Sequence, residues 1–223
     1  FSGIVSAVLP GKWARRINYG MIALVAAMSA WLLVFLVQSG IGSYTFMMGH
    51  FPAPFGNEIR AGVLEAVMAL FFSIVMLLAL WGGQQKIDEE IEASKHNIYY
   101  ILINLLLSSL LALIYTNDLF TAYVFVEINT ISACGLIMIR QTGRTIEAAT
   151  RYMIMSLLGS GLLLLGICML YDLTGHLLMS PAKEAMASLI ATDSYHVPVL
   201  VVLVLMSIIR TLLFCYMDAK GGV

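Results

Sequence analysis

Long uninterrupted apolar runs constrain this chain more than any other feature. A membrane-spanning helix needs about 20 consecutive apolar residues, and the runs here have that length. Helices fit them better than barrel strands, because barrel strands are shorter and alternate apolar with polar residues. Hydrophobic residues make up 61% of the 223 residues, whereas soluble domains are about 45–50% apolar. We therefore predict an all-α polytopic membrane protein, with one transmembrane helical domain over residues 1–223.

About seven spans are expected, of which the first is partial. Residues 1–10 resemble the end of a span whose beginning is missing, since the chain starts with Phe1 and not with methionine. The six fuller spans are expected at 18–38, 60–82, 97–116, 118–139, 149–171 and 196–217. The short link 116–118 predicts that the spans on either side form an antiparallel hairpin. Asn117 and Asp118 are both candidates for the N-cap of the second one.

The basic residues predict an orientation in the membrane. Of the twelve Lys and Arg residues, nine fall in alternate loops, two in the intervening loops, and one, Arg210, inside the last span. Because basic loops face the cytoplasm, loops 83–96 and 140–151 are expected there, with the acidic residues of 88–92 simply solvated. Segment 39–59 is rich in glycine and proline, which predicts an irregular loop on the outer face.

Glu127 is a carboxylate in the middle of an apolar run. A charge at bilayer depth costs several kcal/mol unless it is paired or lines a wet cavity, so it is a functional candidate by default. It lies nine residues past Asp118, and Arg210 lies twelve past Pro198, which are depths of about 13 and 18 Å at 1.5 Å per residue. Two interpretations remain open for a Glu127–Arg210 pair. It is either a structural ion pair or a charged element of a proton or ion pathway.

Glu65 is a third candidate, five residues beyond Arg60 in the 60–82 span. Its position is shallow enough to reach the outer interface. The carboxylate is therefore either bonded to the loop and interface or belongs to the ion pathway, and the sequence leaves both open.

Soluble-enzyme motifs are absent from the sequence. It contains no phosphate-binding loop, dinucleotide fingerprint, zinc-protease motif or nucleophile elbow, and its three cysteines and four histidines lack metal-ligand spacing. A net charge of -1 gives no nucleic-acid footprint. We expect no catalytic, metal or cofactor site in this chain, and no nucleic-acid partner.

Several segments together resemble the antiporter-like membrane subunits of Mrp cation/proton antiporters, complex I and membrane-bound hydrogenases. Residues 115–127 (YTNDLFTAYVFVE) resemble the fifth-helix motif of these subunits, and residues 52–56 (PAPFG) and 147–152 (EAATRY) resemble the MrpD branch. The resemblance implies a multi-pass protein of the prokaryotic cell membrane that moves H+ and/or Na+ beside other membrane subunits.

The same resemblance assigns roles to two residues. Glu127 takes the place of the family's fifth-helix glutamate, and Arg210 takes the place of a lysine on the seventh helix. Arginine does not lose its proton in proteins, whereas a buried lysine can. Cys215 stands where the family has a proline after Phe214. The family's members are also about twice as long, so the resemblance covers an N-terminal repeat only.

Two functions follow as alternatives. The first is an ion-translocating subunit with a buried Glu–Arg pair in its proton pathway, possessing no cofactor itself and serving an ion-translocating antiporter or oxidoreductase complex. The second is a non-conducting structural membrane protein of such a complex, derived from an antiporter. The unswitchable Arg210 and the missing second repeat favour the second, whereas Glu127 favours the first.

Overall fold

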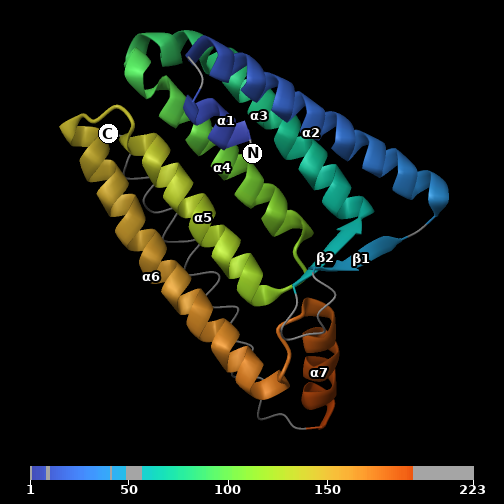
Figure 1. The fold of residues 1–223 in the computed structure, drawn as a ribbon. Coiled ribbons are helices and arrows are strands. Elements are labelled where there is room, and N and C mark those ends of the chain that lie inside the picture. Colours follow the sequence, from blue (N-terminus) through green and yellow to red (C-terminus); the bar gives the residue numbers. More distant parts are fainter. Residues whose placement is uncertain (1, 9–10, 41, 49–56, 193–223) are drawn as a thin grey trace.

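The computed structural model describes residues 2–8, 11–40, 42–48 and 57–192. Helices account for most of this part of the chain, as Figure 1 shows, and five of them are long and apolar enough to cross a membrane. The prediction of an all-α polytopic membrane protein is confirmed in class. The elements in chain order are α1 (Ser2–Val8), α2 (Gly11–Ser39), β1 (Ser43–Met47), β2 (Glu58–Gly62), α3 (Val63–Glu90), η2 (Ala93–Lys95), α4 (His96–Tyr115), α5 (Leu119–Met138), α6 (Gly143–Thr174) and α7 (Met179–Thr192). The expected span 196–217, with Arg210, lies outside the described residues.

The long helices pack side by side in chain order (Figure 1). Helix α2 packs against α3, α4 against α5, and α5 against α6, while the short α1 contacts both α2 and α4. An apolar cluster of Ile22, Leu80, Ile103 and Leu107 joins α2, α3 and α4. Large apolar side chains cover the outside of the bundle, among them Trp31 at 75% exposure, as expected of a surface that faces lipid or other membrane subunits.

Two predicted loops are wrong in extent, because helices continue through them. Helix α3 runs on to Glu90, well into the expected loop 83–96. Helix α6 begins at Gly143 inside the expected loop 140–151, because Thr142 and Thr145 form a reciprocal capping box. Such a box satisfies backbone N–H groups of the first turn, so the helix starts well before the apolar run does.

The expected irregular loop 39–59 is also wrong in part. Strands β1 and β2 pair antiparallel, from Ser43 opposite Gly62 to Met47 opposite Glu58. The β1 sequence, SYTFM, contains tyrosine, threonine and phenylalanine, which favour strands, while the prolines of the segment fall in residues 49–56, outside the described part of the chain. Helix α7 was not expected at all; Pro181 in its first turn is a helix-start signal.

The link between α4 and α5 fulfils the hairpin prediction. The Asp118 side chain accepts a hydrogen bond from the Thr121 backbone N–H at 2.7 Å, so Asp118 is the N-cap of α5. Asn117 has a different role, since its amide donates to the Glu58 carboxylate at 3.2 Å.

Candidate functional site

Glu127 lies on α5, nine residues past the cap residue Asp118. Its Oε1 atom is buried and has no hydrogen-bond partner among the described residues. An ionised carboxylate in a medium of low polarity is strongly disfavoured without such a partner. Arg210, the predicted partner, lies outside the described residues, so the pair stays a prediction.

The packing of α4 on α5 gives the level of Glu127 in the bundle. Gly135 of α5 lies against Leu102 of α4, because a Cβ built at 135 would be 3.0 Å from a Leu102 methyl group. The two helices are antiparallel, so eight residues toward the outer end, roughly 12 Å, bring Glu127 level with residue 110. That level is the outer edge of the apolar cluster, which extends through Leu107 with Leu111 packed against it.

Glu65 lies in the first turn of α3 and is half-buried. Its carboxylate turns back over Gly62, so that a Cβ built at Gly62 would be 2.5 Å from Glu65 Oε2. Across the helix interface, the Tyr115 side chain interacts electrostatically with Glu65 and hydrogen-bonds with Ser29. Glu65 therefore belongs to a polar cluster at the outer ends of α2, α3 and α4, whereas Glu127 lies deeper on α5. Within the described ranges, no hydrogen bond or ion pair joins the two carboxylates.

An amide bridge deep between α1, α2 and α4 was missed by sequence reasoning. Asn18 is fully buried and donates to Ser6 Oγ at 3.0 Å and to the Ala14 carbonyl at 2.7 Å. Asn104 in turn donates to Asn18 Oδ1 and to the Tyr100 carbonyl. The signal available was an asparagine in each of two apolar runs. Only the packing of the helices makes them partners.

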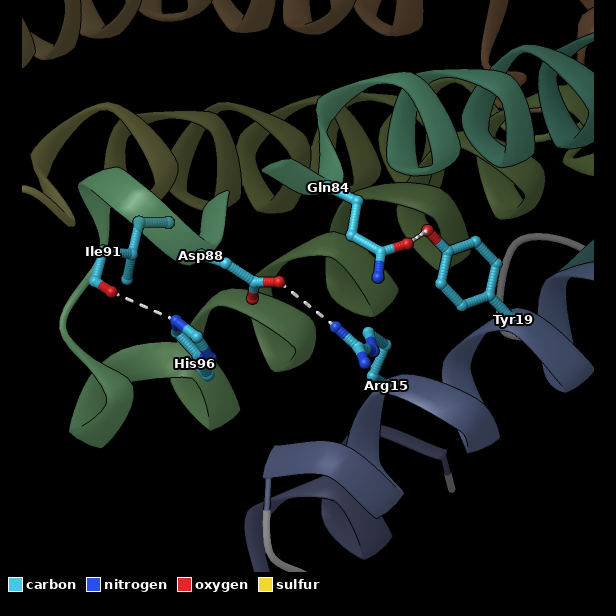
Figure 2. A network of polar contacts seen from close by, with 6 residues as sticks. All are labelled: Arg15, Tyr19, Gln84, Asp88, Ile91 and His96. Atoms are coloured by element: carbon cyan, nitrogen blue, oxygen red, sulfur yellow. Dashed lines mark hydrogen bonds and ion pairs between the residues drawn. The ribbon is translucent and has the colours of Figure 1, made fainter. Parts of the chain in front are cut away.

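Ion pairs join the helix ends at the predicted cytoplasmic face. Figure 2 shows Arg15 of α2 paired with Asp88 of α3 at 3.3 Å, with Tyr19 bonded to Gln84 one turn deeper. Arg140 pairs with Glu90 at 3.3 Å. The expectation that residues 88–92 are simply solvated is therefore wrong, since α3 carries these carboxylates out to basic residues of neighbouring elements. Exposed pairs of this kind are worth about 0–1 kcal/mol each, so they orient helix ends more than they stabilise the fold.

At the outer face, the link into α5 is bonded on both sides. The Asn117 N–H donates to the Glu58 carbonyl at 2.9 Å, and the Asn117 carbonyl accepts from Met179 N–H at 2.9 Å. Leu119 N–H also donates to the Leu177 carbonyl at 3.0 Å. Residues 116–118 thus lie between β2 and the turn that connects α6 to α7.

Metal-binding side chains do not converge in the part of the chain that the structure describes, where no three His, Cys, Asp or Glu residues form a group that could hold an ion. The chemistry available at the described carboxylates is therefore proton uptake and release, or the transient binding of a monovalent cation.

Comparison with known proteins confirms the resemblance suggested by the sequence. Residues 116–215 match the family model described as "NADH:quinone oxidoreductase/Mrp antiporter, TM". The chain is 29% identical over 183 residues to NADH-quinone oxidoreductase subunit N of Azoarcus sp., covering 81% of this chain and 35% of that protein. It is 28% identical over 176 residues to the MrpD protein of a Na(+)/H(+) antiporter from Alkalihalophilus pseudofirmus, covering 79% of this chain and 35% of that protein. It therefore spans about a third of the length of these relatives.

Two solved structures share the fold. A chain of the membrane-bound sulfane sulfur reductase, an archaeal respiratory membrane complex, superposes with a TM-score of 0.74 at 22% identity, over 94% of this chain and 42% of that one. A chain of the Mrp complex from Dietzia sp. DQ12-45-1b gives a TM-score of 0.74 at 19% identity, over 92% of this chain and 38% of that one.

Proposed function

This chain is related to the antiporter-like subunits of Mrp and complex I-like membrane complexes, and from that premise we propose that it moves H+ and/or Na+ across a prokaryotic cell membrane. It acts as one subunit of an Mrp-type antiporter or of an energy-converting respiratory or hydrogenase complex. Other membrane subunits cover part of its apolar surface, and any redox cofactor resides in them.

The buried, unpartnered oxygen of Glu127 carries this proposal. A carboxylate in that position is stable either when a cation approaches it or when it takes up a proton. Alternation between the two states is the elementary step of a proton pathway. Arg210 serves as the approaching fixed charge, because its guanidinium keeps its proton throughout. Glu65 is placed in the same pathway, nearer the outer face.

Replacement of the Glu127 carboxylate tests the proposal. Glu127→Gln keeps the side-chain shape and removes the ionisable group, so ion-coupled proton movement in membrane vesicles is expected to fall about 10²-fold, the lower range for a lost proton-transfer group. Complex assembly should stay intact. Glu147→Gln is the matched control, since Glu147 is exposed and pairs only with Arg151 one turn along α6. Full activity of an assembled Glu127→Gln complex contradicts the proposal.

A second function is favoured by arginine at position 210. A structural subunit that descends from an antiporter needs a permanent ion pair and no switchable lysine. Arg210→Lys separates the two functions, because a conducting subunit gains a cation that can deprotonate and its activity changes in pH dependence. A structural subunit changes only in thermal stability. Activity and unfolding temperature of the same preparation give both answers.

A further inference from the structure

Gly62 is the residue immediately before α3, and it is buried. Its φ of -120° is extended backbone that any residue adopts, so the backbone does not require glycine here. The space does. A Cβ at this position would be 2.5 Å from Glu65 Oε2 and 3.3 Å from the Gly42 carbonyl oxygen. The carboxylate occupies the place that a methyl group would take.

The position of this carboxylate brings it close to polar groups on two other helices. Tyr115 at the end of α4 interacts with Glu65, and Tyr115 also bonds with Ser29 of α2, which is 6% exposed. The three side chains come from three helices that meet at their outer ends. A capping role alone would not require groups from α2 and α4, and Gly62 receives no side-chain cap bond.

We propose that Gly62 is a positioning residue for Glu65, and that the carboxylate so placed is where a monovalent cation enters or leaves the pathway between the outer ends of α2, α3 and α4. This inference rests on the function proposed above. It adds the point of exchange and the residue that keeps it in place. Any side chain larger than hydrogen at position 62 turns Glu65 away from Tyr115 while leaving the carboxylate present.

The test compares Gly62→Ala with Gly82→Ala in the assembled complex in membrane vesicles. Gly82 lies in α3, the helix that carries Glu65, and a Cβ there meets nothing within 4 Å. Two quantities are measured: the rate at which Glu65 reacts with a water-soluble carbodiimide and an amine, followed by peptide mass spectrometry, and the Na+ concentration that gives half-maximal proton movement. For Gly62→Ala both should change about two- to tenfold, the range for one displaced side-chain rotamer. Gly82→Ala should change neither.

A second pair of variants establishes that Gly62 acts through Glu65. In a Glu65→Ala background the clash is gone, so adding Gly62→Ala should leave the half-maximal Na+ concentration where Glu65→Ala alone puts it. An equal shift in both backgrounds overturns the positioning role. An unchanged labelling rate in Gly62→Ala also overturns it.

The cation-exchange role has its own decisive outcome. If Glu65→Ala alters neither the maximal rate nor the half-maximal Na+ concentration, Glu65 does not exchange cations. When Glu127→Gln has lost activity in the same experiment, that outcome defeats this inference and leaves the proposed function standing. A shift with H+ as the only coupling ion, and none when Na+ is varied, assigns the exchange to protons.

Discussion

At the residue scale, the polar side chains inside this bundle divide into satisfied and unsatisfied groups. Asn18 and Asn104 satisfy each other and nearby groups across α1, α2 and α4. Glu127 keeps one buried oxygen without a partner among the described residues. Since an unsatisfied buried group costs more than a bonded one returns, the first set is suited to holding helices together and the second to chemistry.

The amide bridge gives a prediction for stability. Asn18→Leu should lower the free energy of unfolding by about 1–2 kcal/mol, because it leaves the Asn104 amide and the Ser6 hydroxyl without their partner. The double variant Asn18→Leu/Asn104→Leu should cost less than the sum of the single variants, since both polar partners are then gone. Unfolding in detergent measures both. Ser108→Ala is the control, because Ser108 donates to the Leu105 carbonyl of its own helix. Additive losses would contradict a direct bridge.

At the element scale, α4 and α5 approach each other closely at a single glycine. Gly135 lets the Leu102 side chain lie directly on the α5 backbone, with methyl groups 3.0 and 3.1 Å from a Cβ built there. The α4–α5 hairpin carries Glu127, so this contact also fixes how the carboxylate faces the neighbouring helices.

Substitution of that glycine gives a prediction with a rescue. Gly135→Val should destabilise the protein by about 1–3 kcal/mol through overpacking, measured by unfolding in detergent. Leu102→Ala should recover part of that loss in the double variant, because it vacates the space. Gly161→Val provides the comparison, since a Cβ at Gly161 of α6 meets nothing within 4 Å. Equal losses at 135 and 161 would show that valine disturbs helices here irrespective of contact.

At the scale of the whole molecule, the apolar runs alone were enough to predict the helices α2 to α6 and the α4–α5 hairpin. Their ends were not predictable from hydropathy, because caps and polar extensions determine them: the Thr142 capping box starts α6 early, and α3 continues through charged residues to Glu90. These signals are local and were outweighed by the stronger apolar pattern.

The candidate site was predictable to a different degree. A carboxylate in an apolar run identifies Glu127 without any structure, and the α5 register then gives its depth. The setting of Glu65 was not predictable, because it depends on a side-chain rotamer that Gly62 permits and on Tyr115 and Ser29 arriving from other helices. Partnerships of this kind follow from helix neighbours, which hydropathy does not specify.

The bonds on both sides of Asn117 have a mechanical consequence for α5. Sliding the helix along its axis would break backbone bonds to Glu58 and to Met179 together, whereas a tilt about the link would leave them in place. Helix α5 therefore behaves as a lever with its pivot at the outer face. Glu127 lies about 13 Å along the arm at 1.5 Å per residue, so a small angular change at the pivot becomes a displacement of the carboxylate across the bundle.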